Sequence, residues 1–151
     1  MIVNCDMVVA SRTASFALPE VKIGVVALGG GLPRLVRAIG KLRASEMALT
    51  GRRLSAEEAR EWGLVNRVVG EAEKDALNEA VRMAEEVAAN SPDSVVVTRE
   101  GLKMGWEMRV QEATERLRED WWPRIESETN MREGIQAFVE KRTPNWVDFE
   151  L

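Results

Sequence analysis

The sequence predicts an α/β chain that is mostly helical and that holds only part of its fold. Three observations carry this prediction. The first third of the 151 residues is apolar and glycine-rich, whereas the last two thirds are charged and helix-forming. The expected strands are too few and too short to form a sheet that is stable by itself. The apolar residues from Met1 onward have no visible partner, so the chain is expected to begin inside a hydrophobic core.

The N-terminal third alternates extended segments with helices that glycines end. The expected elements are a strand at 7–10, an extended segment at 16–18, a helical turn or bend opened by Pro19, and helices at 32–39 and 42–49. Gly40 and Gly51 stop the two helices, as glycines at helix C-termini commonly do. Residues 28–31, Leu-Gly-Gly-Gly, are too rich in glycine for regular structure.

The remaining two thirds read as helices with one short strand between them. The expected elements are a helix from 56 to about 63, a strand at 65–69, and helices at 73–90, from Pro92 to about 104, at 110–125 and at 130–141. Ser55 and Glu58 have the spacing of a capping box, which places a helix start at Ala56. Pro123 must kink or end its helix. The helix at 73–90 carries one apolar stripe. The stripe consists of Leu77, Val81, Ala84 and Ala88.

Composition excludes several classes of function. The net charge of −4 offers no basic footprint for nucleic acid, and the absence of histidine excludes imidazole relays and histidine-based metal sites. A single cysteine, Cys5, allows neither an internal disulfide nor a multi-cysteine zinc site. No apolar run approaches the roughly 20 residues that a membrane span needs, and the N-terminus does not resemble a secretory signal. We therefore expect a soluble intracellular protein without a histidine-based or multi-cysteine metal site.

Glu20 is the first candidate for chemistry. It follows Pro19 and lies between the apolar stretches 16–18 and 21–26. A carboxyl group in an apolar pocket has a raised pKa, which suits an acid that gives up a proton near neutral pH. The alternative is a glutamate in the first turn of a helix, exposed to water and favoured by the helix dipole. The spacing alone favours this alternative.

Three other features have both a functional and a structural interpretation. The run of Gly29 to Gly31 could bring backbone amides close to a substrate, or could form a turn that needs positive φ. The pairs Arg52-Arg53 and Lys141-Arg142 could meet phosphates, or could be solubilising charge, which is favoured for Arg52-Arg53. Four of the five tryptophans could line a pocket or an interface, although core packing is more common. They are Trp106, Trp121, Trp122 and Trp146.

Several segments match one known family in order and across nearly the whole chain. They are CDMVVAS at 5–11, SFALPEVKIG at 15–24, LTGRRLSAEEA at 49–59, WGLVNRVV at 62–69, and EGIQAFVEKR at 133–142 followed by Pro144 and Trp146. Together they resemble the enoyl-CoA hydratase/isomerase (crotonase) superfamily. Residues 16–20 and 50–59 are most similar to its carnitinyl-CoA dehydratase branch.

The resemblance implies a fold, a reaction and site residues. The fold is a spiral of ββα turns, of which residues 1–70 form the C-terminal end, and residues 71–151 form a helical region that builds homotrimers or hexamers. The substrate is an acyl-CoA thioester, whose enolate is stabilised in an oxyanion hole, and neither metal nor cofactor is expected beyond the CoA of the substrate. A protein of this kind is expected in the cytoplasm or in an organelle matrix (mitochondrion or peroxisome). The resemblance makes Glu20 the group that exchanges the proton at the α-carbon. It makes Leu28, with Gly29 beside it, a position that holds the catalytic water, and it places Lys141 near the adenosine end of CoA.

The resemblance also implies that half of the site is absent. Family members are longer, and the oxyanion amides and a further glutamate fall before Met1. The chain alone is therefore expected to be inactive. Ala27, Leu28 and Leu32 replace the usual residues beside the acyl group, which leaves hydration, dehydration and isomerisation open. The alternative is a non-catalytic module that binds CoA thioesters or supports oligomer formation.

Overall fold

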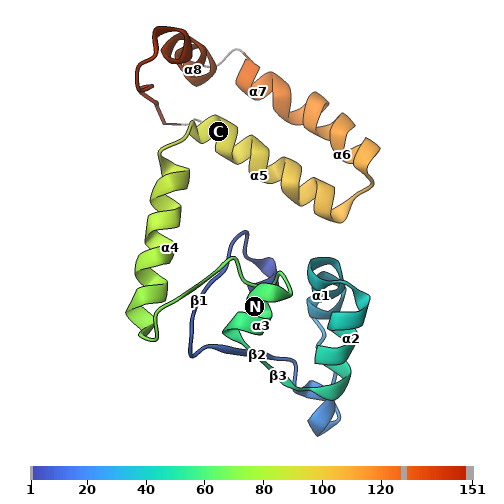
Figure 1. Cartoon of the computed structure of the whole chain (residues 1–151). Coiled ribbons are helices and arrows are strands. Elements are labelled where there is room, and N and C mark those ends of the chain that lie inside the picture. Colours follow the sequence, from blue (N-terminus) through green and yellow to red (C-terminus); the bar gives the residue numbers. More distant parts are fainter. Residues whose placement is uncertain (1, 127–128, 149–151) are drawn as a thin grey trace. The chain divides into compact units, whose positions relative to one another are not determined.

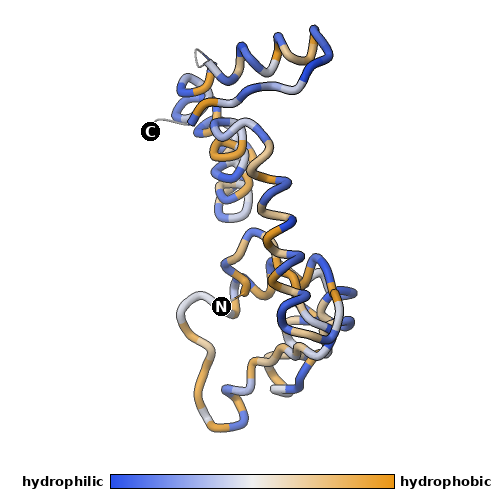
Figure 2. Tube along the Cα trace, turned by 90° about the vertical axis from the view of Figure 1, so that its left-hand side faces the viewer, coloured by the Kyte–Doolittle hydropathy of each residue, from blue (hydrophilic) through white to orange (hydrophobic). Residues whose placement is uncertain are grey.

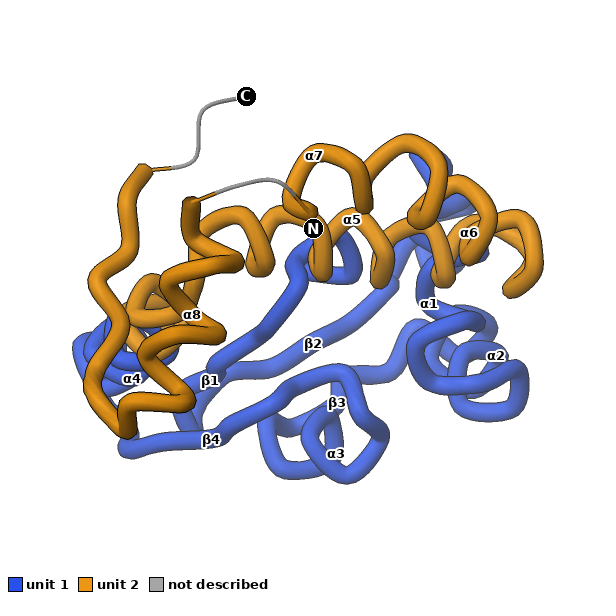
Figure 3. The backbone as a smooth tube through the Cα atoms, turned by 90° about the horizontal axis from the view of Figure 1, so that it is seen from above, with its two compact units in different colours: residues 1–83 blue, residues 84–151 orange. Residues whose placement is uncertain are grey.

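The computed structural model describes residues 2–126 and 129–148, and the chain divides into two compact units, residues 1–83 and 84–151 (Figure 3). Met1, the predicted start of the apolar segment, lies outside the described residues. Helices dominate both units, as the sequence predicts, and the strands are short. No helix in the part of the chain that the structure describes has both the length and the apolar character to cross a membrane.

The first unit holds all the strands that the structure describes (Figure 1). Its elements are η1 (Ile2–Asn4), β1 (Val9–Ser11), β2 (Ser15–Ala17), η2 (Glu20–Ile23), α1 (Gly31–Ile39), α2 (Lys41–Thr50), β3 (Arg53–Ser55), α3 (Ala56–Glu61), β4 (Arg67–Val69) and the N-terminal part of α4 (Glu73–Ala88). Strands β1 and β4 pair in parallel, with Ala10 opposite Val68, and β2 and β3 pair antiparallel, with Phe16 opposite Leu54. These are two separate two-stranded sheets, so neither is a self-sufficient sheet.

One hydrophobic cluster holds the first unit together. Leu54 on β3 is completely buried, and Leu35 on α1 and Met47 on α2 pack in the same cluster. Strand β3 was not predicted from the sequence, because Arg53, Leu54 and Ser55 form a run with only one apolar residue. The strand forms because Leu54 faces this cluster while its two neighbours face water.

The regular elements of the second unit are all helical in its described residues, and residues 141–148 follow the last helix without regular structure. Its elements are the C-terminal part of α4, α5 (Pro92–Glu107), α6 (Val110–Arg116), η3 (Leu117–Trp121), α7 (Trp122–Glu126) and α8 (Thr129–Glu140). Helix α6, the π-helical turn η3 and α7 run back along α5 (Figure 1). Apolar and polar positions alternate along the helical coils in Figure 2, as expected of amphipathic helices.

Two predictions about these helices need correction or refinement. The stripe predicted for α4 is not its buried side, because Leu77 and Val81 are exposed and Met83 is the buried residue of the helix. Pro123 does not end its helix. The wider π turn η3 precedes it, and the Trp122 N–H bonds the carbonyl of Leu117, five residues back. This wider spacing accommodates a proline ring that would crowd an α-helical carbonyl.

Candidate active site

Glu20 begins the single turn η2, immediately after strand β2. Pro19 precedes the turn as its N-terminal cap residue, and Gly24 ends it in the left-handed conformation, at φ 74°. The N–H of Val25 donates to the Glu20 carbonyl at 3.1 Å, so the backbone on both sides of the carboxylate is fixed. The turn holds Glu20 half-buried rather than exposed.

The Glu20 carboxylate has an unusual environment. Its Oε2 atom is buried and accepts no hydrogen bond, and no other side-chain nitrogen or oxygen in residues 2–126 and 129–148 is buried without a partner. Burying a carboxylate oxygen without a partner costs free energy, so native proteins rarely do it without a purpose. Such an atom is suited to accept or deliver a proton when a ligand arrives. The structure therefore does not support the fully solvated alternative for Glu20.

The loop between η2 and α1 contains the other predicted residues of this unit. Gly29 and Gly30 have φ values of 71° and 81°, so the turn does require the left-handed conformation that glycine adopts without strain. A Cβ atom at Gly29 would meet nothing within 4 Å, which leaves that backbone open to a ligand. The Leu28 side chain is 79% exposed. The Leu28 N–H donates to the carbonyl of Val26 at 2.8 Å, so binding water there requires this bond to be shared or opened.

An apolar cavity of about 220 Å³ lies beside the strand that leads into Glu20. Phe16, Ala17 and Leu18 line it from β2 and the residue after it, and Gly31 lines it at the start of α1. The chain thus passes along the cavity immediately before Glu20 and returns to it two residues after Gly29. The carboxylate and the open glycine loop lie on one continuous segment, residues 16–31, which also forms part of the cavity wall. The rest of the wall comes from other parts of the first unit, among them Leu35, Met47 and Leu64.

Lys141 belongs to the second unit. It follows α8, is exposed, and has a φ of 54°. No non-glycine residue besides it has a positive φ within residues 2–126 and 129–148. Its ammonium group forms no ion pair with any residue that the structure describes.

Arg52 is held internally, unlike Lys141. Its Nε donates to Glu46 at 2.7 Å, its Nη1 donates to Glu58 at 3.0 Å, and its guanidinium lies 5.0 Å from the ring centre of Trp62. These contacts join α2, β3 and α3 and favour the structural interpretation of Arg52. The sequence could not reveal this, because the two glutamates lie six residues away on either side. In the part of the chain that the structure describes, no three acidic or cysteine side chains form a group able to hold a metal ion.

Fold and sequence together define the class of protein. Residues 1–149 match the enoyl-CoA hydratase/isomerase family, and the chain belongs to that family. Its structure superimposes on an enoyl-CoA hydratase/isomerase from Mycobacterium paratuberculosis with a TM-score of 0.87 and 36% identity, covering 97% of this chain and 57% of that one. The predicted crotonase-like fold is thereby confirmed, and the chain holds about half of it.

Two relatives show which members of the family this chain is similar to in sequence. The mevalonyl-coenzyme A hydratase of Aspergillus fumigatus is 53% identical over 148 residues, which are 97% of this chain and 54% of the relative. The carnitinyl-CoA dehydratase of Salmonella paratyphi A is 38% identical over 144 residues, covering 93% and 54%. The chain thus spans about half the length of these relatives. The resemblance to carnitinyl-CoA dehydratases is confirmed, and the fungal hydratase is the more similar of the two.

Proposed function

We propose that this chain supplies the C-terminal half of an acyl-CoA hydratase or dehydratase, with Glu20 as the general acid/base at the α-carbon of the thioester. The observation that carries the proposal is the buried, unpartnered Oε2 of Glu20, on the same chain segment as an open glycine loop. Family members act on acyl-CoA thioesters, and the relatives at 53% and 38% identity are named as a hydratase and a dehydratase. These names favour the addition or removal of water over a shift of the double bond.

The proposed chemistry assigns one proton to Glu20. In hydration, the oxygen of water bonds to the β-carbon while its O–H bond breaks and a second proton-transfer group takes that proton. The π electrons of the α,β bond move toward the thioester oxygen, and they then bond the α-carbon to the proton that protonated Glu20 delivers. Dehydration runs the same steps in reverse. Leu28 and Gly29 would lie beside the water and the acyl group, and Lys141 beside the phosphates of CoA. The oxyanion donors and the second proton-transfer group belong to the half that precedes this chain in its relatives.

The assembled protein follows from the same proposal. Residues 1–70 form the end of the spiral core, and residues 71–151 form the region that builds a homotrimer or hexamer. Ile135, Phe138 and Val139 are exposed on α8 and supply apolar surface for such contacts. The substrate is a 3-hydroxyacyl-CoA or its dehydrated product, without further cofactor. A mitochondrial relative is compatible with an organelle matrix and does not exclude the cytoplasm.

The test uses a chimera in which the N-terminal half of the Aspergillus fumigatus relative precedes this chain, hereafter the extended form. Its turnover is measured with mevalonyl-CoA, carnitinyl-CoA and crotonyl-CoA. Glu20→Gln should lower kcat by roughly 10²–10⁴-fold, because a general acid/base contributes about that much, while binding of the thioester survives. Glu61→Gln, at an exposed glutamate of α3, is the matched control and should keep full turnover.

The alternative is a non-catalytic module that binds CoA thioesters or supports oligomer formation. The observation in its favour is that the chain spans about half of its relatives. It predicts that a folded extended form turns over none of the three thioesters. It also predicts that Glu20→Gln changes nothing, including the molar mass of the oligomer in solution. Near-normal turnover of the Glu20→Gln variant would likewise overturn the proposed role of Glu20.

A further inference from the structure

The backbone at Lys141 adopts a strained turn. The Arg142 N–H donates to the Ala137 carbonyl at 3.1 Å, and the Lys141 N–H donates to the Phe138 carbonyl at 3.3 Å. This pair of bonds is a Schellman motif, which ends a helix with a left-handed residue that is usually glycine. Here the residue is lysine. A side chain in this conformation costs free energy and persists only when its surroundings enforce it, most often at functional sites.

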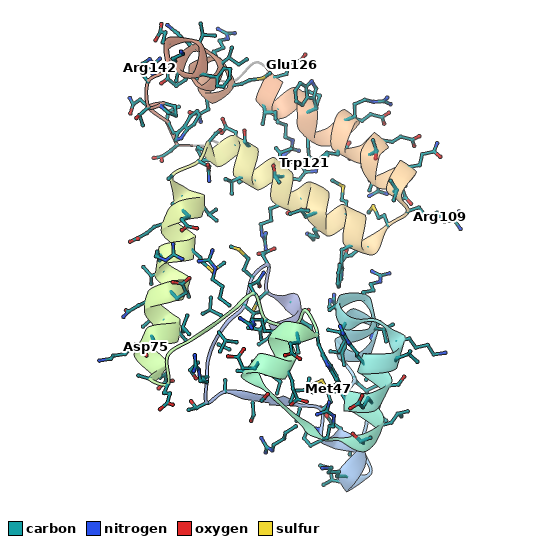
Figure 4. All side chains as sticks on the ribbon, viewed as in Figure 1. Met47, Asp75, Arg109, Trp121, Glu126 and Arg142 are labelled. Atoms are coloured by element: carbon teal, nitrogen blue, oxygen red, sulfur yellow. The ribbon has the colours of Figure 1, made fainter. Side chains whose placement is uncertain are left out.

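Arg142 and Glu133 enforce the turn. The Arg142 Nη2 donates to Oε2 of Glu133 at 2.9 Å, the Nη1 donates to the other oxygen of the same carboxylate, and the Nε donates to Glu140 at 2.6 Å. Glu133 also accepts the backbone N–H of Asn145 at 2.7 Å. The bonds from Arg142 and Asn145 lower the pKa of Glu133 to about 2, so its carboxylate stays charged at neutral pH. Arg142 lies at the end of α8 in Figure 4.

The chain beyond the turn is tied to the same helix. Asn130, which is 2% exposed, accepts the Val147 N–H at 2.9 Å and donates to the Val147 carbonyl at 2.8 Å. The indole of Trp146 lies against Gly134, where a Cβ atom would come within 3.1 Å of the ring. Residues 142–147 are thus fastened back along α8 at both ends.

These contacts give Lys141 and Arg142 different roles. Arg142 is held by two carboxylates and by the carbonyl of Thr143, so moving it toward a ligand would break these bonds. Lys141 has a fixed backbone and an exposed ammonium group that is paired with no described residue. A cation held in this way pays less ordering entropy when it binds an anion.

We propose that Glu133 is a positioning residue for substrate binding: through Arg142 it holds the strained turn that presents Lys141 to a phosphate group of the CoA thioester. This inference rests on the proposed function and deepens it. Glu133 itself touches no substrate. It acts on affinity for the phosphate-bearing part of the substrate and has no part in proton transfer at the thioester.

The experiment compares an acyl-CoA with the matching acyl-pantetheine, which carries the same thioester without phosphates. In the extended form, Glu133→Gln keeps an acceptor for Asn145 but removes the charge that holds Arg142. We expect KM for the acyl-CoA to rise about tenfold, as for the loss of one charge-assisted contact, and kcat to change less than twofold. KM for the acyl-pantetheine should not change. Glu112→Gln, at an exposed glutamate paired with Arg116 on α6, is the matched control and should leave both values unchanged.

Lys141→Gly provides a second variant that does not depend on an intact ion pair. It relieves the strained φ, so the melting temperature should rise, while KM for the acyl-CoA should rise as in Glu133→Gln. Lys141→Arg should restore affinity. An equal rise of KM for both thioesters in Glu133→Gln, or a stabilised Lys141→Gly with unchanged KM, would overturn the inference alone. An unaltered extended form that turns over no thioester would overturn the proposed function, and this inference with it.

Discussion

Leu54 carries more of the first unit's stability than its place in a three-residue strand would indicate. Its side chain is completely buried, opposite Phe16 on β2 and among residues of α1 and α2. Leu54→Ala should lower the free energy of unfolding by about 2–5 kcal/mol, because both transfer energy and packing are lost. Leu42→Ala, at a leucine that is 85% exposed, is the matched control and should cost less than about 0.5 kcal/mol.

Urea unfolding followed by circular dichroism measures both variants, and hydrogen exchange in residues 2–83 locates the effect. Equal losses in the two variants would contradict the central place of Leu54. The same residue shows what a single sequence conceals. Its type is apolar and predictable, but its burial depends on a partner 38 positions earlier, which no local pattern specifies.

At the scale of elements, the capping box at Ser55 is the clearest local signal in the chain. The Glu58 N–H donates to Ser55 Oγ at 3.2 Å, and the Ser55 N–H donates to the Glu58 carboxylate at 3.0 Å. The pKa of Glu58 is lowered, most by the bond from the Ser55 N–H and next by the hydrogen bond from Arg52. Ser55→Ala should destabilise the first unit by about 1 kcal/mol, whereas Ser55→Thr should keep most of the stability because it retains the acceptor. Thermal unfolding of the three proteins tests this, and identical melting temperatures for Ser55→Ala and the unaltered chain would contradict it.

Elements set by local chemistry were predictable, and elements set by distant contacts were not. Ser55 placed the start of α3 correctly, and Gly40 and Gly51 placed the ends of α1 and α2. The strand β3 was missed and the burial of Met83 on α4 was not predicted, because each depends on what the rest of the unit packs against it. Local propensity carries no information about such contacts.

The candidate site shows the same division. The apolar neighbours of Glu20 in the sequence made it a candidate, but only the structure reveals that one of its carboxylate oxygens is buried without a partner. The contact between Glu133 and Arg142 was missed because nine residues separate them, and the helix end between them reverses the chain. The sequence showed that Lys141 and Arg142 are both positively charged. It did not show which of the two side chains stays available to bind an anion.

At the scale of the whole molecule, each unit contains a glutamate whose charge is strongly stabilised. Arg82 and Arg67 lower the pKa of Glu79 to about 2 in the first unit, with Arg82 the larger cause, and Arg142 does the same for Glu133 in the second. A lowered carboxyl pKa contributes stability above the ordinary value, near 4.5. That stability is lost as the pH falls toward the folded-state pKa. Both units should therefore weaken between about pH 4.5 and 2, for the same reason.

Glu79→Gln isolates this contribution in the first unit. At pH 7 the variant should unfold at a lower urea concentration than the unaltered chain, because the ion pairs from β4 and α4 to Glu79 are gone. Below about pH 4.5, Glu79 of the unaltered chain takes up a proton when the chain unfolds, and this proton uptake favours the unfolded state. The difference between the two midpoints should therefore shrink as the pH falls. Glu85→Gln, at an exposed glutamate of the same helix, provides the control and should shift the midpoint little at any pH. Urea titrations at pH 7, 5, 4 and 3 decide the matter. A difference that stays constant down to pH 3 would mean that folding does not lower the pKa of Glu79.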